Sequence, residues 1–379
     1  METFLVASKS ALAVLTRFER IKVVLGNRTC DLDSAICPLA QGLFYYSNLS
    51  DSEKKSIAVI PVMNISEREY RIKTEVVWFL RENGLDSNVI TFRNQIDLRA
   101  LAEDKRLELT LVDHHTLSAE DLQLRDSVVE IIDHRPQDPN WLWPGTKINL
   151  DPVGSCATLV AKNILTTNPK IMDDQLRNLL RGPILVDTDN FLEETAQAKP
   201  LDHEVIRELE KTSSNLCTRE DLYAKILEAK SDVSGLTGGD LLIKDLKVVD
   251  KVAIPGFPML VEKFIELPNA LEDVLSFTES GGFTLAILLG MNLKGEKMRR
   301  DIGVFVPRTS KEHELESRMV SNLLSSTDPS LDLRPVKLPE ETEGHGKAYK
   351  FLLFTQENVR ATRKQILPIV QSALAHSRC

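Results

Sequence analysis

Four apolar segments of the chain each stop at acidic, amide or imidazole side chains. Short apolar runs of this kind are typical of buried strands in a parallel sheet. The segments and the polar residues after them are Ile21–Leu25 before Asn27, Asp31 and Asp33, Leu109–Val112 before Asp113, His114 and His115, Val128–Ile132 before Asp133, His134 and Arg135, and Ile184–Val186 before Asp187. Because ligands bind at the carboxyl ends of strands in an open parallel sheet, we expect these side chains to converge.

Segments with helical periodicity alternate with the apolar runs. Further strands are predicted at residues 57–62 and 89–92, and the predicted helices are 1–20, 35–46, 73–83, 97–103, 117–125, 154–165 and 172–180. This alternation predicts an α/β fold with a doubly wound parallel sheet. We expect it to form a domain over residues 1–200.

A polar stretch interrupts this pattern and predicts a linker at residues 201–220. Beyond it, the pattern predicts a helix at 219–229 and strands at 247–253, 284–289, 303–306 and 351–355, with a final helix from about Asn358. These elements predict a second, smaller α/β domain over residues 221–379.

Composition excludes several classes of protein. The chain has 379 residues, 42% of them hydrophobic, which is ample for two cores, and its net charge of −9 argues against a nucleic-acid or membrane-surface binder. The five cysteines include no Cys-x-x-Cys pair, so neither a disulfide framework nor a zinc site is indicated.

We expect a cytoplasmic protein, because no apolar run approaches the roughly 18 residues of a membrane-spanning helix. The mitochondrial matrix is the alternative, since Lys9, Arg17 and Arg20 lie on an amphipathic pattern like that of a presequence. Glu2 and the strand predicted directly after this segment favour a first helix of the folded domain over a presequence.

Carboxylates dominate the predicted site. Asp31 and Asp33 are two residues apart, and with Asp113, Asp187 and the imidazole of His134 they form a set of hard ligands that suits Mg²⁺ or Mn²⁺. A shared carboxylate is what a two-ion site needs, and Asp113 is the candidate. Aspartate-rich loops are also ordinary turns and helix caps.

The remaining candidates have structural alternatives. Of His114 and His115, we expect one to orient a ligand and the other to face substrate, and His114 is equally consistent with a structural histidine. Asp133 is expected to orient His134, and Arg135 is expected to donate two hydrogen bonds to phosphate oxygens. Lys247, Arg363 and Lys364 are cations that would ordinarily lie on solvated faces.

The motifs together resemble the DHH phosphoesterase superfamily, in the branch whose second domain is a DHHA2 domain. This branch includes family II inorganic pyrophosphatases, exopolyphosphatases and the prune proteins, and an insect member of the prune group is the nearest likeness. The motifs are GNRTCDLDS at 26–34, LVDHH at 111–115, IDHRP at 132–136, VGSCATLV at 153–160 and DVSGLTGGDLLIKDLK at 232–247.

The resemblance implies an active site in the cleft between the domains. It carries over Asp31, Asp33, Asp113, His134 and Asp187 as ligands of two Mg²⁺ or Mn²⁺ ions. It also implies a phosphate-binding role for the second-domain cations Lys247, Arg363 and Lys364. Asn27 and Arg135 stand where pyrophosphatases have histidines, which disfavours pyrophosphate as the substrate.

The expected function is therefore a metal-dependent phosphoesterase that hydrolyses cyclic AMP or cyclic GMP, short-chain polyphosphate, or both. The expected catalytic residues are Asp113, His115, Arg135 and Lys247, and the expected substrate-binding residues are His114, His115, Arg135, Lys247, Arg363 and Lys364. The alternatives are an inorganic pyrophosphatase and a catalytically weak regulatory scaffold that binds nucleoside diphosphate kinase, a partner implied by the resemblance.

Overall fold

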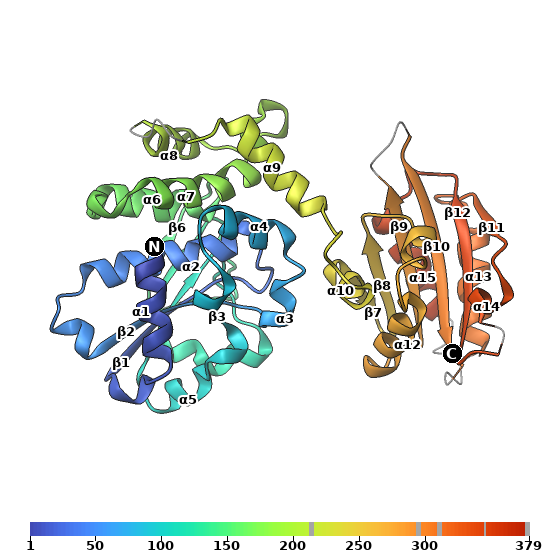
Figure 1. Cartoon of the computed structure of the whole chain (residues 1–379), viewed down its shortest axis with the longest axis horizontal. Coiled ribbons are helices and arrows are strands. Elements are labelled where there is room, and N and C mark those ends of the chain that lie inside the picture. Colours follow the sequence, from blue (N-terminus) through green and yellow to red (C-terminus); the bar gives the residue numbers. More distant parts are fainter. Residues whose placement is uncertain (212–215, 293–296, 309–312, 345, 376–379) are drawn as a thin grey trace. The chain divides into compact units, whose positions relative to one another are not determined.

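The computed structural model describes residues 1–211, 216–292, 297–308, 313–344 and 346–375 (Figure 1). The chain forms two compact units, Met1–Asp232 and Val233–Cys379. The division follows Asp232 because helices α8 (Pro200–Glu210) and α9 (Arg219–Ser231) pack on helices of the first unit. The linker predicted at 201–220 thus coincides with α8 and the start of α9, and its residues 212–215 lie outside the described part.

The first unit contains a six-stranded sheet in which every pair of neighbours is parallel. Its order is β3-β2-β1-β4-β5-β6, and the strands are β1 (Arg20–Leu25), β2 (Ile57–Met63), β3 (Thr91–Phe92), β4 (Leu107–Val112), β5 (Val128–Asp133) and β6 (Lys147–Leu150). The chain runs outward from β1 to β3 and then returns to the other side of β1. This reversal between β1 and β4 confirms the predicted doubly wound sheet.

Helices cover the sheet and leave a core on each face. The remaining helices of this unit are α1 (Glu2–Leu12), α2 (Leu32–Asn48), α3 (Glu67–Tyr70), α4 (Thr74–Glu82), α5 (Leu98–Glu103), α6 (Cys156–Thr167) and α7 (Asp174–Asp187). Val24 belongs to the core beneath α2, α6 and α7, whereas Val23 and Leu25 belong to the core on the opposite face. This alternation is the period-two pattern of a strand buried on both sides.

The predicted strand at Ile184–Val186 is wrong, because these residues form the last turn of α7. The preceding Gly182-Pro183 indicated a break, but the helix continues through both residues. Gly182 lies where the Phe79 ring of α4 packs, and an added Cβ would come within 2.4 Å of that ring. Asp187 therefore ends a helix, and only three of the four predicted strand ends are strand ends. The predicted first helix also stops early, at Leu12.

The second unit contains a mixed six-stranded sheet of order β11-β12-β10-β9-β8-β7, antiparallel except for the β8–β9 pair. Its strands are β7 (Leu246–Val249), β8 (Val252–Phe257), β9 (Leu285–Asn292), β10 (Arg299–Pro307), β11 (Leu333–Val336) and β12 (Tyr349–Gln356). Its helices are α10 (Gly238–Lys244), α11 (Val261–Phe264), α12 (Ala270–Ser280), α13 (His313–Ser325), α14 (Glu340–Glu343) and α15 (Arg363–Ala375). The single strand predicted at 247–253 is a hairpin.

Among the helices described, none has both the length and the apolar character needed to cross a bilayer.

We expect Gly182→Ala to lower the free energy of unfolding of the first unit by about 1–3 kcal/mol, because the new methyl group overpacks against the buried Phe79 ring. Tryptophan fluorescence in urea measures this, since Trp78, Trp141 and Trp143 all lie in the first unit. The double variant with Phe79→Leu should lose less unfolding free energy than the two single variants lose in sum, because the smaller side chain makes room for the new methyl group. A wild-type unfolding midpoint for Gly182→Ala would contradict the close packing of α4 on α7.

A candidate metal centre at three strand ends

Asp113 is the first residue after β4 and has a left-handed backbone, with φ of 62°. This conformation costs about 1–2 kcal/mol in a residue other than glycine and is concentrated at functional sites. Three hydrogen bonds hold it: the Asp113 amide donates to the Ile132 carbonyl at 2.9 Å, Asn27 Nδ2 donates to the Asp113 carbonyl at 3.2 Å, and Arg135 Nη1 donates to the same carbonyl. Strand β5 and the loops after β1 and β5 thereby fix the direction of the Asp113 side chain.

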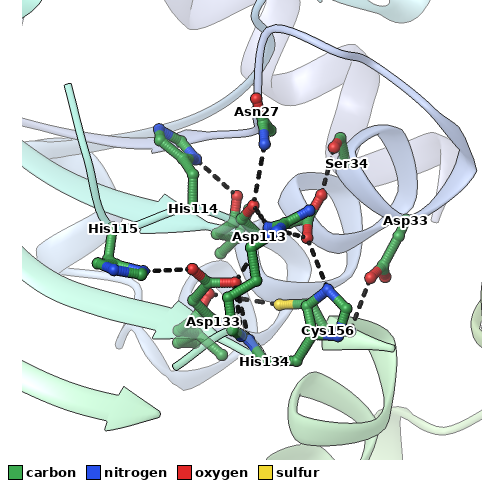
Figure 2. A network of polar contacts seen from close by, with 12 residues as sticks. Asn27, Asp33, Ser34, Asp113, His114, His115, Asp133, His134 and Cys156 are labelled. Atoms are coloured by element: carbon green, nitrogen blue, oxygen red, sulfur yellow. Dashed lines mark hydrogen bonds and ion pairs between the residues drawn. The ribbon is translucent and has the colours of Figure 1, made fainter. Parts of the chain in front are cut away.

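The Asp113 carboxylate is 1% exposed and has three partners, of which Ser34 and His134 are labelled in Figure 2. The Ser34 hydroxyl donates to Oδ2, while His134 Nε2 lies 3.3 Å and Arg135 Nη1 2.8 Å from Oδ1. Burial by itself would raise the pKa of Asp113, but the His134 hydrogen bond, the Arg135 charge and the Ser34 hydroxyl outweigh it. The pKa of Asp113 therefore lies below its ordinary value, and the carboxylate is ionised at neutral pH.

Asp33 lies in the first turn of α2, not in the preceding loop, and accepts hydrogen bonds at the N-terminus of α6. Its two oxygens accept from the amides of Cys156 at 2.6 Å and Ala157 at 2.8 Å. Burial, and then the charge of Asp113, raise the pKa of Asp33 to about 7. The positive end of α6 partly compensates the buried charge.

His134 presents one ring nitrogen to Asp113. Its Nδ1 lies 3.0 Å from the Val153 carbonyl, which can only accept, so Nδ1 carries a proton and Nε2 faces the carboxylates. Burial lowers the pKa of His134, but Asp113, the charge of Asp33 and the Val153 carbonyl together raise it to about 9. In the metal-free protein, a proton on Nε2 balances the two carboxylates.

One ligand atom from each of Asp33, Asp113 and His134 lies within 4.8 Å of the others. A divalent ion with bonds of about 2.0–2.6 Å can join atoms at such separations. Two carboxylates and one imidazole, with its other nitrogen held by a carbonyl, are a donor set that fits Mg²⁺ or Mn²⁺. The sequence prediction of a carboxylate-rich metal centre thus has its geometric core in these three residues.

Asp31 and Asp187 lie at the border of this cluster. Asp31 caps α2, with Oδ1 accepting from the Ser34 amide at 3.0 Å. Asp187 Oδ2 is buried and has no hydrogen-bond partner among the described residues. Burial, and then the charges of Asp33 and Asp31, raise the pKa of Asp187 well above its ordinary value. A bound cation would satisfy the orphaned oxygen, so Asp187 also fits a ligand role.

Both histidines after Asp113 are engaged within the protein. His114 Nδ1 lies 2.9 Å from the Val112 carbonyl, and burial lowers the pKa of His114. His115 is 5% exposed; its Nδ1 lies 2.6 Å from Asp133 Oδ2, and its Nε2 accepts from the Asp138 amide at 2.9 Å. His115 therefore carries its proton on Nδ1.

Asp133 has a different partner from the one expected. Its Oδ2 orients the ring of His115, and its Oδ1 accepts from the His134 backbone amide at 2.8 Å rather than from the imidazole. The backbone carbonyl of Val153 orients the His134 ring instead. Because every residue carries a carbonyl, the sequence contains no signal for this contact.

Arg135 adds a permanent positive charge to the cluster. Its Nη1 lies 2.8 Å from Asp113 Oδ1 and 3.1 Å from Asp133 Oδ1, and its side chain is 43% exposed. Burial opposes the charged form, but the two carboxylates raise the pKa of Arg135 above its ordinary value. The guanidinium is thus both bound to the ligand set and accessible to an anion.

The three cations of the second unit are described within that unit alone. Lys247 on β7 and Lys364 on α15 are exposed. Arg363 begins α15 and is bound to Asp245, with Nη2 2.7 Å from Oδ1 and Nη1 donating to the Asp245 carbonyl at 2.6 Å. Lys247 and Lys364 therefore present their charges to solvent, while Arg363 is held in place.

Comparison with known proteins defines the class. The family model of the DHHA2 domain matches residues 224–373, which include nearly all of the second unit. Together with the Asp-His-His sequence that follows β4, this match defines a DHH protein with a DHHA2 domain, as the sequence motifs indicated.

A relative that matches nearly the whole of this chain identifies the family. Exopolyphosphatase PRUNE1 of Homo sapiens is 34% identical over 381 residues, covering 99% of this chain and 80% of the human protein. The Mus musculus protein prune homolog 2 is 29% identical, covering 100% of this chain and 12% of that protein. A manganese-dependent inorganic pyrophosphatase of Methanothrix thermoacetophila is 28% identical over 39% of this chain and 46% of its own length. The chain belongs to the prune family.

We expect the affinity for Mn²⁺ to increase as the pH rises from about 6 to 9. The pKa of Asp33 is about 7 and that of His134 about 9, so an ion must displace their protons. Titration calorimetry in two buffers of different ionisation enthalpy measures both affinity and proton release. In His134→Gln, the increase in affinity between about pH 7 and pH 9 should disappear. An affinity of the wild-type protein that does not change with pH would contradict the role of Asp33 and His134 as ligands.

The same two pKa values are both raised above the ordinary ones, so the metal-free folded state binds these protons more tightly than the unfolded state does. We therefore expect the stability of the metal-free protein to fall as the pH rises toward 9. The stabilisation from the Asp33 proton is lost as the pH rises to about 7, and that from the His134 proton is lost as the pH rises to about 9. Urea denaturation in chelator at several pH values measures this, with His134→Gln as the comparison.

Proposed function

We propose that the protein is a metal-dependent hydrolase of phosphoanhydride bonds in short inorganic polyphosphates. The observation that carries the proposal is the convergence of ligand atoms from Asp33, Asp113 and His134 at the β1–β4 switch point of the sheet. Membership of a family whose relatives are named exopolyphosphatases supports the choice of substrate. We further propose that the ion is Mg²⁺ or Mn²⁺.

When bound, such an ion supplies Lewis acidity toward a phosphoryl oxygen and lowers the pKa of a coordinated water. Asp113 and Asp33 would be its carboxylate ligands, and His134 would offer Nε2 because Nδ1 is held by Val153. We extend the ligand set to two ions, with Asp113 shared and with Asp31 and Asp187 completing it. The orphaned Oδ2 of Asp187 supports this extension.

Arg135 is proposed to neutralise charge on the phosphoryl group that is transferred. Its guanidinium is fixed by Asp113 and Asp133 and is nearly half exposed, so it can bind a phosphate oxygen without first being ordered. His115 is proposed to act through Asp133, since both of its ring nitrogens are bonded and its ring is buried. His114 is assigned to the support of the loop after β4 by its contact with the Val112 carbonyl.

We assign substrate binding in the second unit to Lys247, Arg363 and Lys364. Their charges complement a polyphosphate chain, and the resemblance to family II pyrophosphatases implies the same role. Lys247 and Lys364 are exposed, and the ion pair with Asp245 holds the Arg363 guanidinium in place.

We expect Asp113→Asn to lower turnover of tripolyphosphate by at least about 100-fold, because the variant loses the charge that pairs with His134 and Arg135 and would bind the ion. With Mg²⁺ or Mn²⁺, release of inorganic phosphate is measured on tripolyphosphate and pyrophosphate, and formation of the nucleoside monophosphate is measured on cyclic AMP and cyclic GMP. Asp51→Ala is the control, since the Asp51 side chain is fully exposed and remote from the cluster in sequence.

The substrates separate the candidate functions. Turnover of tripolyphosphate that is lost in Asp113→Asn supports the proposal, and preferred turnover of pyrophosphate or of a cyclic nucleotide would reassign the substrate. Mn²⁺ binding without turnover of any compound would instead indicate a regulatory scaffold. Such a protein would bind ligands or a partner such as nucleoside diphosphate kinase.

We expect Lys247→Gln to raise the KM for tripolyphosphate and to leave the affinity for Mn²⁺ unchanged, because Lys247 supplies charge for the substrate and no ligand for the ion. Steady-state kinetics and metal titration measure the two quantities. Lys251→Gln removes an equal charge from the same hairpin and is the matched control. An equal change in KM for both variants would argue that only the overall charge of the hairpin matters.

A further inference from the structure

We propose that Asp202 is a positioning residue of the metal centre, which it orders through the segment Val153–Thr158. The proposal deepens the proposed function and rests on it, because it concerns the same ligand set. Asp202 belongs to α8, and none of its contacts joins it directly to a ligand of the cluster.

Asp202 is a fully buried carboxylate whose contacts join α8 to the start of α6. Oδ2 accepts from the Gly154 amide at 2.7 Å and from the Lys199 amide at 2.7 Å, and Oδ1 accepts from the Thr158 hydroxyl at 2.6 Å. Two of these donors lie 44 and 48 residues earlier in the chain. Only the Lys199 contact is local to α8, where it caps the helix.

The segment that Asp202 holds makes the supporting contacts of two ligands. The Val153 carbonyl accepts from His134 Nδ1 and so fixes the direction of Nε2. The amides of Cys156 and Ala157 donate to the two oxygens of Asp33. One carboxylate on α8 therefore fixes the backbone that orients both an imidazole and a carboxylate of the candidate centre.

The packing around Gly154 leaves no room for a side chain at this position. An added Cβ at Gly154 would lie 2.9 Å from Asp202 Oδ2 and 2.6 Å from Thr188 Cγ2. Thr188 is buried and directly follows Asp187, the residue with the orphaned carboxylate oxygen. Gly154 thus lies between the anchor on α8 and the residue that follows Asp187 at the end of α7.

Metal affinity is sensitive to such supporting contacts, because ligands that are not held in direction must be ordered when the ion binds. Without the Asp202 carboxylate, the Gly154 amide and the Thr158 hydroxyl lose their buried acceptor. The segment would then relax, and its backbone groups would no longer hold the His134 ring and the Asp33 carboxylate in fixed directions. We expect weaker metal binding in addition to lower stability.

The test compares Asp202→Ala with Asp301→Ala in the full-length protein. Asp301 is likewise a buried carboxylate that accepts two backbone hydrogen bonds, from Val261 at 2.8 Å and Glu262 at 2.9 Å, but it lies in the second unit. Mn²⁺ affinity is measured by calorimetry, and the nitrogen hyperfine coupling of bound Mn²⁺ by pulsed electron paramagnetic resonance. Urea denaturation of each variant measures stability.

We expect Asp202→Ala to weaken Mn²⁺ binding by about 10- to 100-fold and to alter or abolish the nitrogen coupling that reports His134. Asp301→Ala should retain wild-type affinity and coupling even where it lowers stability. Asp202→Asn should restore most of the affinity, because its amide oxygen can accept from Gly154 and its amide nitrogen can donate to Thr158.

Wild-type Mn²⁺ affinity in Asp202→Ala, or equal losses in Asp202→Ala and Asp301→Ala, would overturn the positioning role while leaving the proposed function intact. A wild-type protein that binds no Mn²⁺ would overturn both. Should Asp202→Ala not fold, Thr158→Val removes one of the same contacts. An unchanged affinity in that variant would then reject the proposal, and a weakened one would support it.

Discussion

The candidate centre is organised by the need to neutralise carboxylates that are buried close together. Asp33 and Asp113 offer oxygens within 4.8 Å of each other and of His134 Nε2, where water cannot screen their repulsion. In the metal-free protein, Arg135, protonated His134 and the amides at the start of α6 balance this charge. Two carboxylates buried side by side cost free energy in the absence of a cation. A divalent cation can replace the His134 proton and balance their charge, so the arrangement is suited to binding an ion.

The fold brings these groups together at one edge of the sheet. The strands β1, β4 and β5 are adjacent and parallel, so the loops that follow them meet, and α2 and α6 begin in the same place. Each loop then fixes its neighbour: Asn27 holds the Asp113 backbone, and Val153 holds the His134 ring. The hydrophobic cores on both faces keep the strand ends in register, while the polar contacts set the direction of the ligands. Asp202 contributes to both stability and site geometry, because it caps α8 and also holds the segment before α6.

Much of this arrangement could be predicted from residues that carry a local signal. The apolar runs before Asn27, Asp113 and His134 identified three neighbouring strand ends, and the parallel sheet followed from their alternation with helices. Ile184–Val186 was misleading because Gly182-Pro183 resembles a break, whereas the glycine serves the packing of Phe79 in a continuous helix. The supports of the ligands were invisible, since Val153 contributes a carbonyl and Cys156 an amide, and the backbone of every residue offers such groups. Asp202 lies too far along the chain for any spacing rule to connect it to Gly154.

We propose that Asp33, Asp113 and His134 form one metal centre. Anomalous diffraction from crystals grown with Mn²⁺, recorded on both sides of the manganese absorption edge, locates the bound ion. We expect an anomalous peak within bonding distance, about 2.0–2.4 Å, of Nε2 of His134 and of oxygens of Asp33 and Asp113. Manganese bound elsewhere on the protein, with His134 Nε2 still paired to the Asp113 carboxylate, would contradict it.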